Sequence, residues 1–407
     1  RFQNRRGGEF IPIRHWCGVV CNEDGHVTDI NWRTIDYSTF LKYKGSVDVK
    51  HLPPTLLRFH ADNCRLTSVG NLSDLPRSLL EINIGYNRIS GTLTLDDLPP
   101  KLEILNVKHN LLTGPMGVSR LPKTLRNLNL SENRIGGTMT FDGLPPNLET
   151  LDVGYNSLEG PVDFSKLPNS LRTLNIPGNR IGGSISFTGL PRNLQFLCIS
   201  HCGFEGSVDF SLLPQTLRGL FMCRNNFSGR LNTASLPRNL IQLDVYQNSF
   251  QGDVDWAHLP PHLELLKIGH NKLTGRLNLS RLPEGLVDGS FSRNRFEGEV
   301  DLTHLPRSIK GLHVDQNRLE GTVSIQNLPS TLLYLSLNDN NFDEYVIDEN
   351  LPRAMLYLSV DFISGMEEVS HPLQRQLRKH TRSVNLVNMH TRRLKRCFRE
   401  PRQLTNR

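Results

Sequence analysis

A Leu-Pro pair recurs along the chain at a fixed interval, and this interval constrains the fold more than any other feature of the sequence. Proline follows leucine every 23 residues, from Pro53 to Pro352. A fixed period of this length is typical of a solenoid, in which each unit buries its apolar face only against its neighbours. We therefore expect a repeat domain at 51–363, an N-terminal basic arm and cap at 1–50, and a C-terminal cap and basic tail at 364–407.

Each repeat contains a short apolar alternation that is followed by asparagine. In one unit, Leu148, Leu151 and Val153 have the spacing LxxLxV, and its last part has the period of two expected of a strand. Asn156 follows three residues later, where an inward amide can bond backbone groups of neighbouring coils. Most units have the same residue at this ladder position: Asn87, Asn110, Asn133, Asn156, Asn179, Asn225, Asn248, Asn271, Asn294, Asn317 and Asn340.

Glycine lies four residues after the ladder position in every unit from Gly91 to Gly321. It favours a sharp turn, after which a second alternation such as 162–164 indicates a shorter extended segment on the convex side. The Leu-Pro pair disfavours helix. The predicted fold class is a β-rich repeat solenoid of about 13 coils, with a parallel concave sheet, short second strands, tight convex turns and little helix.

The pattern LxxLxLxxN/CxL resembles the leucine-rich repeat and covers about 300 of the 407 residues. The variant with G-x-V-D and Leu-Pro resembles repeats of protist proteins of this family, including those of kinetoplastids. Residues 15–32 resemble the N-terminal cap of plant members, W-x-G-V-x-C, which has a second cysteine where this sequence has Arg14 and His15. The residues that match the cap are Trp16, Gly18, Val19, Cys21, Gly25, Val27, Thr28 and Ile30. The resemblance implies a leucine-rich repeat superhelix that offers its concave face to another macromolecule.

The sequence has no Walker loop, HExxH, GxSxG or dinucleotide fingerprint, so we expect no enzyme, no catalytic residue and no cofactor. Cys198, His201 and Cys223 form the one metal-like group with Cys202, but Cys202 occupies a ladder position, as Cys64 does. One ligand is then missing from a closed zinc site, so no metal is expected. An aspartate row at 46-residue intervals is interpreted as a surface row beside the second strand: Asp163, Asp209, Asp255 and Asp301.

The concave face can be read from the positions six, four, two and one before each ladder residue, most of which hold small or polar side chains. Three consecutive coils differ and predict a partner-binding patch: Phe196, Cys198, Phe221, Cys223, Arg224 and Tyr246. Clustered aromatic residues with an arginine are enriched at the centres of protein interfaces. The alternative is local packing between bulky neighbours, with no ligand.

Charge is unevenly distributed. Residues 371–407 contain eleven Lys and Arg and one acid, for +10, and residues 1–16 have +3. With +7 for the whole chain, 17–370 carries −6. The densest run predicts an RNA-binding or acidic-partner site in the tail: Arg392, Arg393, Lys395, Arg396 and Arg399. A solvated tail is the alternative.

The seven cysteines are odd in number and irregularly spaced, which favours a reducing compartment, the cytoplasm or an organelle such as the mitochondrion, over secretion. The cap resemblance and four glycosylation sequons point the other way. The sequence contains no run of 18 apolar residues, so it predicts no membrane span. Three functions stay open: a protein-interaction scaffold within a larger assembly, a structural subunit of a ribonucleoprotein, and a secreted or surface receptor of the plant type.

Overall fold

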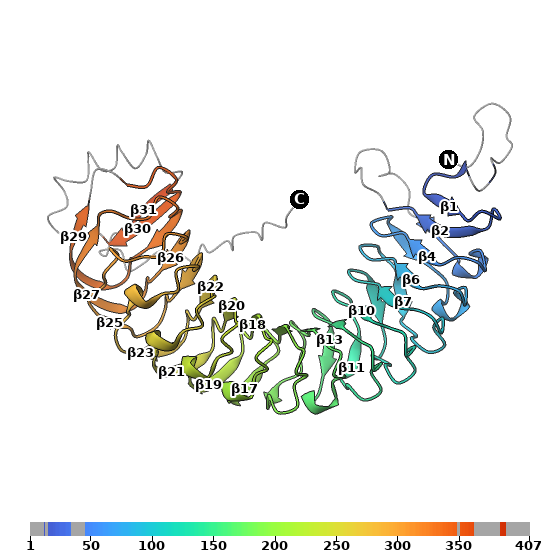
Figure 1. Cartoon of the computed structure of the whole chain (residues 1–407), viewed down its shortest axis with the longest axis horizontal. Helices are drawn as coiled ribbons and strands as arrows, with labels where there is room; N and C mark the ends of the chain where they lie inside the picture. The colour runs from blue at the N-terminus through green and yellow to red at the C-terminus, as the bar shows by residue number, and fades with distance from the viewer. Residues whose placement is uncertain (1–11, 13–14, 34–44, 348–350, 362–382, 388–407) are drawn as a thin grey trace.

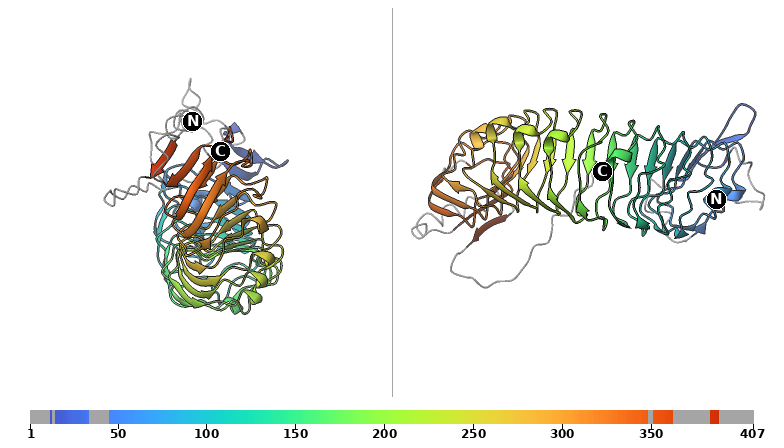
Figure 2. Two further views of the ribbon diagram at one scale, coloured as in Figure 1. Left: turned by 90° about the vertical axis from the view of Figure 1, so that its left-hand side faces the viewer. Right: turned by 90° about the horizontal axis from the view of Figure 1, so that it is seen from below.

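The protein is an arc of stacked coils with a continuous parallel sheet along its inner side (Figure 1). The computed structural model describes residues 12, 15–33, 45–347, 351–361 and 383–387. Each coil contributes one strand to the inner sheet and most contribute a second strand to the outer side, as the view from below makes clear (Figure 2). The expected β-rich solenoid is confirmed, and fourteen coils run from β4 to β30 within the described residues.

The inner, concave sheet has strands of three to five residues. Its strands are β1 (Val19–Cys21), β2 (Val27–Asn31), β4 (Arg58–His60), β6 (Glu81–Asn83), β8 (Ile104–Asn106), β10 (Asn127–Asn129), β12 (Thr150–Asp152), β14 (Thr173–Asn175), β16 (Phe196–Cys198), β18 (Gly219–Phe221), β20 (Gln242–Asp244), β22 (Leu265–Lys267), β24 (Asp288–Ser290), β26 (Gly311–His313), β28 (Tyr334–Ser336), β30 (Tyr357–Asp361) and β31 (Ser383–Val387). From β4 to β30 every strand pairs in parallel with the strand 23 residues away, so equivalent residues lie side by side.

The outer, convex side has shorter sheets and 3₁₀ helices. Its strands are β3 (Gly45–Ser46), β5 (Leu66–Ser68), β7 (Ser90–Thr92), β9 (Leu111–Thr113), β11 (Gly136–Thr138), β13 (Ser157–Glu159), β15 (Gly183–Ser184), β17 (Phe204–Ser207), β19 (Asn226–Arg230), β21 (Ser249–Asp253), β23 (Lys272–Thr274), β25 (Glu297–Gly298), β27 (Arg318–Ile325) and β29 (Asn341–Ile347). Its 3₁₀ helices are η2 (Val49–His51), η3 (Leu72–Asp74), η4 (Phe164–Lys166), η5 (Phe210–Leu212), η6 (Thr233–Ser235), η7 (Trp256–His258) and η8 (Leu279–Arg281).

The asparagine ladder forms as the sequence predicts. The Asn156 Nδ2 donates to the carbonyl oxygens of Leu130 and Val153, at 3.0 and 3.1 Å, and its Oδ1 accepts from the Ile135 N–H at 2.9 Å. In a cysteine coil, the Cys202 Sγ donates to the Ile176 carbonyl at 3.2 Å. Each ladder side chain therefore joins its own coil to the preceding one.

The expectation for the convex segment was wrong in its position. The second strand of the Asn156 coil is β13, directly after the ladder residue, and the segment 162–164 leads into the 3₁₀ helix η4. Asp163 caps this helix, because its Oδ1 accepts from the Ser165 N–H at 2.9 Å. Equivalent aspartates accept the same bond: Asp209, Asp255 and Asp301. These aspartates therefore lie where the extended backbone ends and turns, and they do not form a row beside a second strand.

The two ends of the described solenoid have different structures. At the N-terminal end, β1 pairs antiparallel with β2 and makes a hairpin over the region of the plant-like motif. At the C-terminal end, β31 continues the parallel sheet beside β30. The Asp361 carboxylate, at the end of β30, accepts from the Asp339 and Asn340 backbone N–H groups and so joins β30 to the preceding coil. Among the described residues no helix is long and apolar enough to cross a bilayer.

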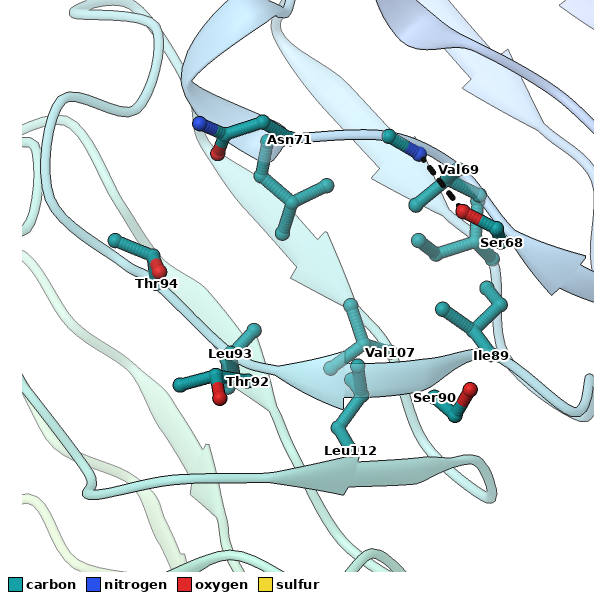
Figure 3. A pocket seen from close by; sticks show the side chains of 13 residues that line it. Ser68, Val69, Asn71, Ile89, Ser90, Thr92, Leu93, Thr94, Val107 and Leu112 are labelled. Atoms are coloured by element: carbon teal, nitrogen blue, oxygen red, sulfur yellow. Dashed lines mark hydrogen bonds between the residues drawn. The ribbon is translucent and has the colours of Figure 1, made fainter.

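The core runs the length of the described arc, and a cavity lies in it near the N-terminal end. On the convex side, coils carry stacked rings such as Phe141 and Phe164, whose centroids are 6.2 Å apart. The coil of Cys64 has Leu72 at the position of these rings, and Gly70 where later coils have a buried aliphatic residue such as Leu93. A cavity of about 360 Å³ lies beside Gly70 and Leu72, lined by residues of this coil and the next two (Figure 3).

Candidate functional site

The structure places all six predicted patch residues on the concave face. Phe196 and Cys198 are the ends of β16, Phe221 is the last residue of β18, and Cys223, Arg224 and Tyr246 follow their strands. Because β16 and β18 pair in parallel, Cys198 lies directly beside Phe221, and Phe196 lies beside Gly219. Phe196 is 38% exposed, although most large hydrophobic side chains of the protein are buried.

Gly219 explains how two phenylalanine rings share this part of the sheet. A Cβ atom at Gly219 would lie 2.7 Å from the Phe196 Cδ1 and 3.0 Å from the Phe221 Cε2. Both rings therefore lean over the space that a side chain would fill. A larger residue at 219 would displace one ring, so the sequences of two neighbouring coils together make this surface.

A hollow of about 350 Å³ extends from this surface toward the N-terminal half of the concave face. It is lined by Lys108, Ser131, Glu132, Asp152, Tyr155, Asn175, Pro177, Cys198 and Phe221. Of the predicted patch, only Cys198 and Phe221 line it. We call the apolar part of this hollow, formed by Tyr155, Pro177, Cys198 and Phe221, the concave groove.

Tyr155 is the groove residue that the sequence reasoning missed. Tyr155 is 57% exposed, and its backbone φ is +53°. A left-handed residue other than glycine or asparagine costs of the order of 1 kcal/mol. The ring lies over Gly178 of the next coil, where a Cβ atom would come within 2.6 Å of the Tyr155 Cδ1. A large aromatic residue directly before a ladder asparagine, followed by glycine 23 residues later, was the available signal.

Tyr246 does not join the groove. Its ring lies 5.8 Å from the His270 ring, centroid to centroid, and a Cβ atom at Gly269 would lie 3.3 Å from its Cδ2. The side chain therefore leans toward the C-terminal coils, away from Cys223. It marks the border of the predicted patch rather than its centre.

Charged side chains flank the groove at both ends. Toward the N-terminus, the Lys108 Nζ lies 3.1 Å from a Glu132 carboxylate oxygen. Toward the C-terminus, the Lys267 Nζ lies 3.3 Å from an Asp288 carboxylate oxygen. These two lysines are therefore paired with acids other than Asp152 and Asp244, which lie closer to the groove.

Asp152 and Asp244 are half-buried carboxylates held mainly by backbone. The Asp152 Oδ1 accepts from the Gly154 N–H at 3.1 Å, and the Asp244 Oδ1 accepts from the Tyr246 N–H at 2.9 Å. No Lys or Arg among the described residues forms an ion pair with either group. Burial raises the pKa of both carboxyl groups above the ordinary value, in spite of these hydrogen bonds.

The thiols of the patch are apolar surface rather than reactive groups. Burial raises the pKa of Cys198, and it raises that of Cys223 to about 11, so both are protonated near neutral pH. Cys202 is raised to about 12. In the described part of the chain, no three His, Cys, Asp or Glu side chains are arranged to hold a metal ion. The basic-tail residues, from Arg392 to Arg399, lie outside the described residues.

Three solved structures place this architecture among known folds. YopM from Yersinia enterocolitica is 30% identical, with a TM-score of 0.56, over 76% of this chain and 65% of that chain. The functional domain of InlJ from Listeria monocytogenes is 19% identical, with a TM-score of 0.52, over 76% of this chain and 70% of that chain. The plant peptide hormone receptor RGFR1, in complex with RGF2, is 18% identical, with a TM-score of 0.53, over 92% and 83%.

The fold is a leucine-rich repeat superhelix. No protein-family model matches the chain, and neither does any curated protein. The chain spans 65% of the length of the YopM chain that it matches. The protist-like repeat type and the plant-like cap stay predictions from the sequence.

Proposed function

We propose that the protein is a non-enzymatic interaction scaffold that binds a protein partner on its concave face, as a subunit of a larger assembly. The observation that carries this proposal is the concave groove, an apolar hollow on a face whose other outward positions are mostly small or polar. Apolar surface with aromatic side chains and a polar rim is characteristic of interface centres.

The groove is arranged as a partner site requires. Tyr155 and Phe221 offer rings at its two ends. The Tyr155 ring rests on Gly178 of the next coil and the Phe221 ring on Gly219 of its own strand, instead of filling the core. Rings held in this way lose little conformational freedom on binding, which lowers the cost of association. The peptide hormone receptor RGFR1, which shares this fold, is known in complex with RGF2. We extend the use of the fold as a binding surface to this chain as a proposal.

The test compares a double variant with a matched control on the same face. Tyr155→Ala with Phe221→Ala removes both rings of the groove, whereas Tyr334→Ala removes a ring that is 42% exposed on β28, outside the groove. The immobilised full chain, each variant and the control are exposed to a native lysate, and the retained proteins are quantified. We expect proteins that are retained by the wild type and the control and lost by the double variant, at a cost of several kcal/mol. Equal retention by all three proteins, with unchanged folding, would refute the proposal.

A second candidate function rests on the charge of residues 371–407, which is +10. A tail with this charge suits RNA, and binding would then weaken steeply with salt because phosphate contacts release counterions. Sedimentation of the native protein with and without ribonuclease separates the two functions. Collapse of a large particle on ribonuclease treatment supports a ribonucleoprotein subunit, and a resistant complex supports the protein scaffold. A reducing compartment is proposed on the cysteine pattern alone.

A further inference from the structure

One row of side chains crosses the concave groove from coil to coil. Parallel pairing places Asp152, Asn175, Cys198, Phe221 and Asp244 side by side on successive strands, from β12 to β20. The row therefore begins and ends with a carboxylate, and the polar Asn175 and the apolar Cys198 and Phe221 lie between them. Neighbouring strands lie about 4.8 Å apart, so the two aspartates are separated by roughly 19 Å.

Each end of the row carries excess negative charge. At one end, Glu132 pairs with Lys108 at 3.1 Å and with the His109 ring at 2.7 Å, and with His109 neutral the charge of Asp152 is left. At the other end, Asp288 neutralises Lys267 at 3.3 Å and leaves the charge of Asp244. Both carboxylates are half-buried, so a ligand can reach them while much of their hydration is already lost. A cationic side chain of a ligand would complete the charge balance at each end.

The two carboxylates lower the stability of the folded chain when they are ionised. Burial disfavours the charged form, and the raised pKa of each group records that penalty. An amide could accept the same backbone hydrogen bond without the penalty, and Asn106, Asn129 and Asn175 hold the equivalent position in other coils. Ionisable groups with this balance are typical of functional sites.

The separation of Asp152 and Asp244 determines which two residues of an extended peptide can contact both carboxylates when the peptide crosses the strands. An extended chain rises about 3.3 Å per residue, and every second side chain points to the same face. Residues one and seven then point to the sheet about 20 Å apart, which matches the separation of the two aspartates. Residue five falls over Phe221, and residue three falls between Asn175 and Cys198.

We propose that the groove binds an extended peptide segment of a partner protein, with Lys or Arg at its first and seventh positions and apolar side chains at its third and fifth. This inference rests on the proposed function of the concave face and names the chemistry of the partner. Asp152 and Asp244 bind the two cations, and the surface between Tyr155 and Phe221 takes the apolar side chains. A cation spacing shorter than six residues leaves one carboxylate without its partner.

The test is a selection from a random dodecapeptide phage library on the immobilised full chain, followed by titration of the selected peptides. We expect enrichment of two cations six residues apart with apolar residues between them. Asp152→Asn and Asp244→Asn should each weaken these peptides about ten-fold, because each variant removes one charged hydrogen-bond acceptor. Glu205→Gln, which removes an exposed acid from the convex strand β17, is the matched control and should change affinity less than two-fold. A direct comparison uses the peptide KSLSFSK and its isomer KSKSLSF, which has the same composition with its cations two residues apart.

The outcomes separate this inference from the proposed function. Peptides without the cation spacing that still lose affinity for Phe221→Ala would overturn the inference and leave the binding face intact. Peptides indifferent to Phe221→Ala and to both Asp variants, or no enrichment at all, would overturn the inference, whereas the proposed function is refuted only by equal retention of lysate proteins by the wild type and the double variant. A synthetic peptide of residues 391–400 that binds the groove more tightly than every selected peptide would assign the groove to the chain's own tail, and the inference of a partner segment would be wrong.

Discussion

Replacing Asn271 by alanine is expected to lower the free energy of unfolding by about 3 kcal/mol. The Asn271 Oδ1 accepts from the Phe250 N–H at 2.9 Å, and its Nδ2 donates to the carbonyl oxygens of Val245 and Ile268, both at 3.0 Å. The two carbonyls also accept from the neighbouring ladder amides of Asn248 and Asn294, so each keeps one partner in the variant. The buried Phe250 N–H has no such substitute.

The magnitude follows from this difference. An orphaned buried N–H costs about 1 to 3 kcal/mol, and the loss of the amide donor bonds adds about 1 kcal/mol. Asn271→Cys should cost about 1 kcal/mol less than the alanine variant, because a thiol can still donate to the Val245 carbonyl, as Cys202 does to Ile176. It offers only a weak acceptor to the Phe250 N–H.

Urea unfolding gives the total cost, and native-state hydrogen exchange of the Phe250 amide gives the local one. We expect exchange of this amide to accelerate in both variants, while amides several coils away are unaffected. A cost below 1 kcal/mol for Asn271→Ala, or an unchanged exchange rate of the Phe250 amide, would refute the ladder argument.

Two further predictions test packing and charge. Leu72→Phe should raise the free energy of unfolding by about 1 kcal/mol, because a ring at this position fills part of the 360 Å³ cavity, as Phe164 does in its own coil; a lower urea midpoint would contradict this. Asp244→Asn should become more stable relative to the wild type as pH rises above about 4. The raised pKa of Asp244 in the folded protein means that ionisation of this carboxyl destabilises the wild type, whereas the amide of the variant does not ionise. Lys267, Asp288 and Cys223 face this group and are unchanged in the variant, so equal pH profiles of unfolding for the two proteins would count against a penalised carboxylate.

The local sequence was sufficient for the repeat architecture because each rule acts within one coil or between equivalent positions. The 23-residue period, the apolar alternation before Asn156 and the glycine four residues later all predict the same coil, and the coil must stack to bury its leucines. The second strand of the coil was predicted at the wrong place because residues 162–164 alternate in polarity as a strand does. Its direction is decided by the Asp163 cap, a side-chain bond that competes with extended pairing.

The solenoid, the ladder and the row of residues on the concave face all follow from the repeat, because its period and the parallel register fix which positions face outward. The directions of those side chains do not follow from the repeat and depend on the folded chain. Tyr155 rests on Gly178 and belongs to the groove, whereas Tyr246 leans over Gly269 and leaves it. The same holds for charge, since Lys108 pairs with Glu132 and not with Asp152. These side-chain directions and ion pairs depend on contacts between residues about 23 positions apart in the sequence. The geometry of such contacts cannot be read from the repeat pattern.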